Sequence, residues 1–224
     1  RKKMINEKEL RLDYFIDPQR KVFQDPEHFC FNTDTRLLAQ FSHIKKGETV
    51  LDIGTNNGVL LVYASQFAPK KLIGVEVLEH SYELACFNAG QFIKQECEII
   101  HAPIQDVSID PVDVILSNPP FFEIRELHPD TKITKRALGR FEINCTLEEL
   151  ISSAARLLKS NGRFYFVHRP DRIFEIFLML GKYKFSVKRI QVAYDARSRG
   201  AKSLLVEAIK DGHTKTRIED SVWI

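Results

Sequence analysis

Cysteine is scarce in this chain, and none of it forms a metal-binding pattern. The four cysteines are scattered through 224 residues without a C-x-x-C pair, and no histidine stands near them at the spacing of zinc ligands. This distribution predicts reduced thiols in the core. We also expect no bound metal. The four positions are Cys30, Cys86, Cys97 and Cys145.

Long apolar segments are missing as well. No stretch approaches the roughly 20 residues that a membrane helix needs, and residues 1–20 are charged rather than continuously apolar, unlike a signal peptide. The composition, 44% hydrophobic and 28% charged, is typical of a globular protein. The sequence therefore predicts a protein without membrane contact, and we expect it in the cytoplasm.

Repeats, low-complexity tracts and clear linkers are also absent, so the length fits one sizeable domain with attached segments. Residues 14–16 and 21–23 flank a turn-prone segment and predict a small hairpin that serves as a lid or brace. We expect an N-terminal extension with this hairpin over residues 1–32, a main domain over 33–212 and a C-terminal tail over 213–224.

Strand-like and helical patterns alternate along the main domain. Helical periodicity covers residues 78–93, and Thr146 begins a capping-box pattern whose helix we expect to end at Asn161 and Gly162. This alternation predicts an α/β fold with a doubly wound sheet. The seven expected strands cover residues 49–53, 71–75, 98–101, 112–116, 163–167, 185–192 and 203–209.

The loop after the strand at 112–116 has unusual chemistry. The double proline Pro119-Pro120 must end the strand, and the loop offers the Asn118 amide, two carbonyls and the rings of Phe121 and Phe122. Rings can stack on a base while the amide oxygen and a carbonyl accept the two hydrogens of an amino group. The alternative is a stiff loop whose phenylalanines cap the core.

A glycine-bearing turn over residues 54–58 follows the first strand of the main domain. Glycines let the backbone approach a ligand closely. Glu76 ends the next strand, 24 positions after Asp52, where an acid is placed to accept hydrogen bonds from ribose hydroxyls. The turn and Glu76 together indicate that Glu76 binds the ribose of a nucleoside-bearing ligand. The alternative is that Glu76 is merely solvated at the strand end.

The net charge of +3 is modest, but basic residues cluster late in the chain. Residues 131–140 contain no acid, and residues 182–202 contain seven basic residues and one acid with three aromatic residues among them. This mixture favours a nucleic acid backbone, although the first segment also fits a solvated loop. The candidate substrate contacts are Phe122, Lys135, Arg136, Arg140, Arg197, Arg199 and Lys202.

These motifs, the turn over 52–58, Glu76 and the Asn-Pro-Pro-Phe loop, resemble the class I methyltransferases that use S-adenosylmethionine and modify an amino group on a planar substrate. Further similarity at residues 28–34, 140–142 and 167–170 and in the basic final turn extends over nearly the whole chain. It is similar to the bacterial transfer-RNA methyltransferases that form N6-methyladenosine next to the anticodon of a valine tRNA.

This resemblance implies a Rossmann-like, seven-stranded and mostly parallel sheet with helices on both faces and an antiparallel final strand. It also implies S-adenosylmethionine as the cofactor and tRNA as the partner. We expect a monomer, although the sequence itself leaves dimerisation open. The implied catalytic residues are Asn118, Pro119, Pro120 and Phe121. The implied cofactor-binding residues are Asp34, Asp52, Gly54, Thr55, Asn56, Gly58, Glu76, Val77 and Pro103.

Some positions leave alternatives open. Asn56 replaces the family's usual middle glycine, so we expect a left-handed backbone there. Pro103 stands where an acid usually lies near the cofactor adenine, unless Asp106 takes that role, and Asp34 also fits a helix-capping function. The alternative activities are methylation of a protein glutamine amide or of adenine in DNA or ribosomal RNA, and the alternative without catalysis is RNA binding.

Overall fold

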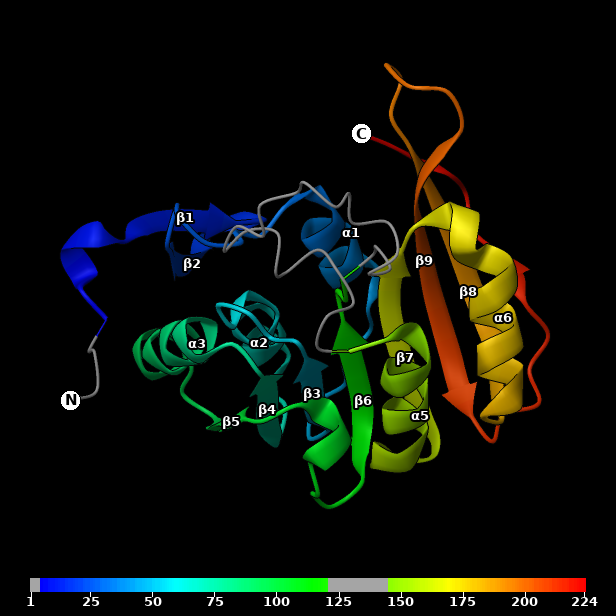
Figure 1. Cartoon of the computed structure of the whole chain (residues 1–224), viewed down its shortest axis with the longest axis horizontal. Helices are drawn as coiled ribbons and strands as arrows, with labels where there is room; N and C mark the ends of the chain where they lie inside the picture. Colours follow the sequence, from blue (N-terminus) through cyan, green and yellow to red (C-terminus); the bar gives the residue numbers. More distant parts are fainter. Residues whose placement is uncertain (1–4, 121–144) are drawn as a thin grey trace, which may run out of the picture.

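The computed structural model describes residues 5–120 and 145–224. Within these ranges one sheet of nine strands dominates, in the order β10-β8-β9-β7-β6-β3-β4-β5, with β11 also pairing with β8 (Figure 1). The strands are β3 (Thr49–Ile53), β4 (Lys71–Glu76), β5 (Glu96–His101), β6 (Val112–Ser117), β7 (Leu158–His168), β8 (Phe185–Tyr194), β9 (Ala201–Lys210), β10 (Arg217–Ile218) and β11 (Val222–Trp223).

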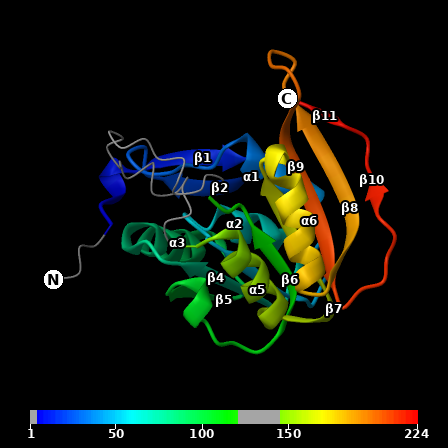
Figure 2. The same ribbon diagram turned by 45° about the vertical axis from the view of Figure 1, so that its right-hand side comes forward.

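The sheet has the expected mostly parallel pairing. Strands β5, β4, β3, β6 and β7 pair in parallel, and β9 runs antiparallel between β7 and β8. These seven strands and the antiparallel final strand confirm the sequence prediction. The two further strands come from the C-terminal segment, whose short β10 and β11 lie in parallel along the outer edge of β8 (Figure 2).

Helices cover both faces of the sheet because the central strands are apolar on both sides. Neighbouring residues such as Val50 and Leu51, or Val114 and Ile115, are all fully buried but belong to two separate core clusters. One cluster includes α1 (Thr33–Phe41) and α2 (Val59–Ala64), next to which α3 (Glu79–Phe92) packs; the other includes α5 (Leu147–Leu157) and α6 (Ile173–Lys182). The short helices are η1 (Glu7–Glu9), η2 (Ser65–Phe67), η3 (Ile104–Asp106) and η5 (Pro170–Arg172).

The predicted end of α5 at Asn161 and Gly162 is wrong. Helix α5 ends at Leu157, where Leu158 takes an extended conformation and already begins β7. Asn161 adopts φ 63° within β7 rather than at a helix end. The pairing of β6 with β7 shifts register at this point, so the turn-forming residues accommodate an irregularity in the strand.

The predicted hairpin is confirmed, with a different turn. Strands β1 (Arg11–Phe15) and β2 (Asp17–Gln24) pair antiparallel around Ile16, which has φ 67°, and the turn-prone residues 18–20 form an irregularity in the pairing. Asn88 of α3 holds this hairpin: its side chain accepts from the Phe23 N–H and donates to the Phe23 and Asn57 carbonyls, each at 2.8 Å. The fully buried amide thus joins β2 to the turn after β3.

The four cysteines, all among the described residues, form no disulfide and are less buried than expected. Cys86 is exposed, and the other three cysteines are half-buried, so the prediction of core thiols is wrong in that respect. Among the residues with described positions, no helix combines the length and apolar character needed to cross a membrane.

Candidate active site

A cavity of about 300 Å³ lies at the carboxyl ends of β3, β4 and β6, where parallel α/β sheets usually bind ligands. In Figure 1 the β1–β2 hairpin and the β8–β9 turn stand on this same side of the sheet. The turn after β3, the end of β4 and the loop after β6 all contribute to its lining. The predicted site residues that line it are Asp52, Gly54, Thr55, Asn56, Glu76, Val77, Pro103, Asn118, Pro119 and Pro120.

The turn after β3 brings backbone rather than bulky side chains to the cavity. Gly54 adopts φ 70° and Asn56 adopts φ 53°, which confirms the left-handed conformation expected of Asn56. The N–H groups of Gly54 and Thr55 both donate to the Val75 carbonyl, at 2.9 and 3.0 Å. The turn is therefore fixed to the end of β4.

Glu76 is held by backbone N–H groups at the tip of β4. Its Oε2 accepts from Asn56 at 2.9 Å, and its Oε1 accepts from Val77 and Leu78 at 2.9 and 3.0 Å. Burial raises the pKa of Glu76, and these N–H groups act in the opposite direction. Each carboxylate oxygen has two lone pairs, so Oε2 can accept one more hydrogen bond from a ligand in the cavity.

Asp52 lacks the partners that Glu76 has. Both of its carboxylate oxygens and the hydroxyl of Thr55 are buried without a hydrogen-bond partner in residues 5–120 and 145–224. Burial raises the pKa of Asp52 to about 7; the neighbouring Thr55 hydroxyl acts against this rise, and the charge of Glu76 adds to it. An unpaired buried carboxylate is costly, so this site fits a ligand that brings a positively charged hydrogen-bond donor.

Asn118 has a fixed side-chain orientation. Its Nδ2 donates to the Thr35 hydroxyl at 3.0 Å. That hydroxyl also accepts from the Asn32 N–H and donates to the Asn32 carboxamide oxygen, both at 3.2 Å, as part of the capping box of α1. Since Thr35 holds the nitrogen end of the amide, the oxygen end remains as an acceptor for a ligand.

Two predicted cofactor residues lie outside the cavity lining. Asp34 accepts a hydrogen bond from the hydroxyl of Ser203 in β9, and burial raises its pKa against that bond and the nearby charge of Lys202. Gly58, with φ 80°, is the residue before α2 and faces Ala85 of α3. Five other predicted residues lie outside the described ranges: Phe121, Phe122, Lys135, Arg136 and Arg140.

An aromatic pair lies beside the basic turn between β8 and β9. Trp223 of β11, which is 68% exposed, stacks on half-buried Tyr194 at the end of β8 with ring centroids 5.2 Å apart. Arg197 and Lys202 lie 3.0 and 3.6 Å from the Asp195 carboxylate. Arg199 forms no ion pair with any residue that the structure describes.

The comparison with protein families decides the assignment. The sequence profile of the family described as "Methyltransferase small domain" matches residues 21–179. The chain belongs to this family. It is a methyltransferase that depends on S-adenosylmethionine, and the unpaired Asp52 and Thr55 fit this cofactor, whose methionine end carries an ammonium group.

Similar curated proteins are named tRNA1(Val) (adenine(37)-N6)-methyltransferase. The one from Proteus mirabilis is 31% identical over 82% of this chain and 74% of its own length. The one from Dyadobacter fermentans is 30% identical over 70% of this chain and 66% of its own length. In several of these relatives, therefore, about a third of the protein's own length lies outside the matched segment.

Solved structures support the same fold at lower sequence identity. A tRNA methyltransferase from M. jannaschii superposes with a TM-score of 0.66 at 12% identity, over 92% of this chain and 58% of that chain. A ribosomal protein methylase from Lactobacillus delbrueckii superposes with a TM-score of 0.61 at 18% identity, over 84% of each chain.

Sequence analysis missed two residues that organise the methyltransferase site. Thr35 has the spacing of a capping box with Asn32, but its contact with Asn118 joins residues 83 positions apart. Asn88 lies inside α3, where a buried asparagine is unusual and signals a polar partner. Both signals were present in the sequence, although neither identifies the partner.

Asp52 predicts a pH-dependent stability for the cofactor-free methyltransferase. Because its pKa is raised to about 7, the folded protein keeps a proton that the unfolded chain releases, and the free energy of unfolding falls as pH rises from about 4 through 7. We expect Asp52→Asn to remove up to about 4 kcal/mol of this pH dependence. Urea unfolding between about pH 4 and pH 8 measures it.

The exposed Asp106 provides a matched control for this experiment, and Asp106→Asn should keep the pH dependence of the wild type. If Asp52→Asn also keeps it, Asp52 does not hold a proton in the folded state.

Proposed function

We propose that this methyltransferase modifies the exocyclic N6 amino group of an adenine in tRNA, at adenine 37 next to the anticodon of a valine tRNA. The observation that carries the proposal is the Asn118 amide, whose nitrogen is held by Thr35 and whose oxygen is left to accept from a planar amino group. The names of the relatives support the choice of tRNA and of this adenine.

An exocyclic adenine nitrogen is a poor nucleophile because its lone pair is delocalised into the ring. We propose that the Asn118 oxygen and the main-chain carbonyl of Pro119 accept its two hydrogens, which favours a pyramidal nitrogen and directs the lone pair. The nitrogen loses its proton after the methyl transfer, so the site needs no strong general base. Alignment of the reacting atoms supplies up to roughly 7–11 kcal/mol.

The cofactor supplies an electrophilic methyl group on a sulfonium when bound. In this proposal Asp52 and the turn over 54–58 hold its methionine end, and Glu76 accepts from its ribose hydroxyls. Pro103 and Val77 line the cavity beyond Glu76 and fit the adenine. These residues bind and orient, and the deep burial of Asp52 and Glu76 keeps water from their carboxylates.

The surface around the cavity supports a polyanionic substrate. The β8–β9 turn approaches the start of α1 through the bond from Ser203 to Asp34, and α1 also carries Thr35. Arg199 is available for a phosphate, and exposed Trp223, stacked on Tyr194, offers a face for stacking an unpaired base. We propose the same roles for the basic residues predicted between 131 and 140, with Phe121 stacking on the target base.

We also propose that the chain is divided as the sequence predicts. Residues 1–32 then form an extension whose hairpin braces the cofactor turn through Asn88, residues 33–212 form the methyltransferase domain, and residues 213–224 form a tail along β8.

Transfer of a labelled methyl group from S-adenosylmethionine tests the substrate. Unmodified bulk tRNA, ribosomal RNA, duplex DNA and ribosome-associated protein are offered in parallel, and the RNA products are digested to nucleosides. We expect label in tRNA as N6-methyladenosine. Label in protein alone would instead identify a glutamine amide, and label in DNA or ribosomal RNA alone would identify another adenine substrate; each result contradicts the proposal.

Asn118→Ala should separate catalysis from cofactor binding. We expect methyl transfer to fall by about 10²–10³-fold, since an oriented acceptor is lost, while calorimetry shows unchanged affinity for S-adenosylmethionine. Thr35→Val, which keeps the side-chain shape but removes the hydroxyl, should lower kcat, and Thr35→Ser should restore it. An equal loss of cofactor affinity in Asn118→Ala would show a structural role instead.

The basic turn and the aromatic pair should affect RNA binding in different ways. Arg199→Ala should weaken tRNA binding and reduce the slope of log Kd against log salt by about 1. Trp223→Ala should weaken the free energy of tRNA binding by about 1–3 kcal/mol without changing that slope. Fluorescence titration over a salt series measures both, and Lys46→Ala is the control because exposed Lys46 precedes β3 at the opposite edge of the sheet. Equal slopes for Arg199→Ala and wild type would exclude this phosphate contact.

A further inference from the structure

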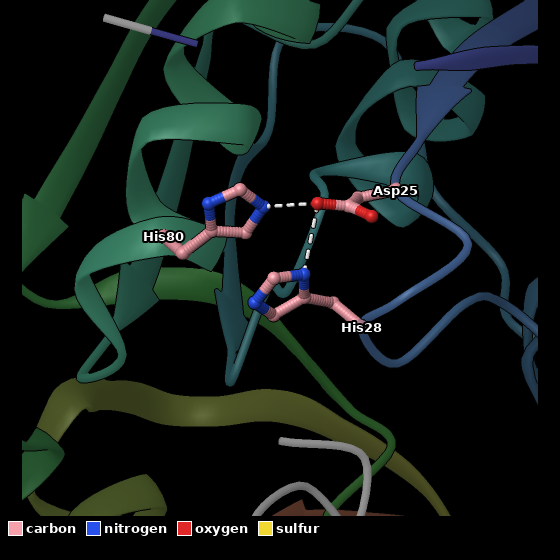
Figure 3. Close-up of side chains that lie close together, drawn as sticks. All are labelled: Asp25, His28 and His80. Atoms are coloured by element: carbon pink, nitrogen blue, oxygen red, sulfur yellow. Dashed lines mark hydrogen bonds and ion pairs between the residues drawn. The ribbon is translucent and has the colours of Figure 1, made fainter. Parts of the chain in front are cut away.

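Three side chains converge beside the cofactor cavity and take no part in the proposed chemistry. Asp25 and His28 come from the loop between β2 and α1, and His80 comes from the first turn of α3 (Figure 3). Both histidines line the cavity. The cluster therefore connects the loop after the hairpin with the helix that follows Glu76.

The two imidazoles approach the same carboxylate oxygen. His28 Nδ1 and His80 Nε2 each lie 2.8 Å from Asp25 Oδ2, and one ligand atom from each of the three residues lies within 4.8 Å of the others. The two rings stack with centroids 3.8 Å apart and planes inclined by 18°. The side chains of Asp25 and His28 are largely shielded, with exposures of 13% and 16%, and the His80 side chain is 37% exposed.

The carboxylate is prepared for a cation. The Glu27 N–H donates to Asp25 Oδ1 at 2.9 Å, and the His28 N–H donates to the Asp25 carbonyl at 3.0 Å, so the loop holds Asp25 in place. Asp25 Oδ1 is thus held by its own loop, while Oδ2 faces both imidazoles.

His80 adds a second observation. Its Nε2 is buried and, despite its approach to Asp25, makes no well-formed hydrogen bond with any residue that the structure describes. A shielded ring nitrogen without such a bond is uncommon. In the tautomer that carries its proton on Nδ1, His80 has a lone pair on Nε2, which a metal ion can use at the point where His28 and Asp25 also converge.

We propose that Asp25, His28 and His80 bind one divalent transition-metal ion of the Zn²⁺ type. Two imidazole nitrogens and one carboxylate oxygen are ligands that these ions prefer over Mg²⁺ or Ca²⁺. Bonds of about 2.0–2.2 Å place tetrahedral ligand atoms about 3.3 Å apart, so the pairs now 2.8 Å apart need to separate by a few tenths of an ångström. The fourth position is left for water.

The bound ion would fasten the loop between β2 and α1 to α3 at the rim of the cavity. This position couples metal occupancy to cofactor affinity, because both ligands order the same residues. The inference does not depend on the identity of the methylated substrate. Three ligands separated by 3 and 52 positions match no metal motif, which explains why the sequence led us to expect no metal.

Calorimetric titration of the chelator-treated full chain with ZnCl₂ tests the site. We expect one ion per chain for the wild type and at least about tenfold weaker binding for His80→Gln and for Asp25→Asn. His213→Gln, which changes an exposed histidine elsewhere, should bind as the wild type does. Circular dichroism confirms that each variant is folded, and either ligand variant alone decides the outcome if the other unfolds.

Titration with Co²⁺ distinguishes this site from metal binding by the cysteines. Ligation by nitrogen and oxygen gives d–d absorption bands without a thiolate charge-transfer band, and the bands should disappear in His80→Gln. Absence of binding, unchanged affinity in the folded ligand variants, or a thiolate band would each overturn the proposal.

Discussion

The proposed active site depends on the hydrogen bond from Asn118 to the Thr35 hydroxyl. This hydroxyl uses all of its capacity: it accepts from Asn118 and from the Asn32 N–H, and it donates to the Asn32 side chain. The capping box that begins α1 thus also orients the amide of the loop after β6. One hydrogen bond therefore connects the start of α1 with the loop at the carboxyl end of β6.

The two buried carboxylates of the cavity differ in the hydrogen-bond donors that they receive. Glu76 receives three backbone N–H groups from the turn and from the start of α3, whereas Asp52 receives none from the described residues. The backbone therefore already supplies hydrogen-bond donors to the Glu76 carboxylate in the empty site, whereas the Asp52 carboxylate receives no such donors until a cationic group binds. Asn88 adds rigidity by tying the hairpin to this turn.

Much of the fold was predictable because apolar strands and helical periodicity are patterns among residues that are close together in the sequence. The turn after β3, Glu76 and the Asn-Pro-Pro loop were predictable for the same reason, since each is a short local motif at the end of a strand. The end of α5 was not, because Asn161 is equally suited to a helix end and to an irregular strand. The contacts of Thr35 and Asn88, and the Asp25–His28–His80 cluster, join distant segments and required the structure.

A crystal structure with S-adenosylhomocysteine tests the account most directly. We expect S-adenosylhomocysteine in the cavity at the ends of β3 and β4, with its ammonium group at Asp52, its ribose at Glu76 and its sulfur directed toward Asn118. Binding elsewhere on the chain, or in the same cavity with the ribose and amino-acid ends exchanged, would contradict the account.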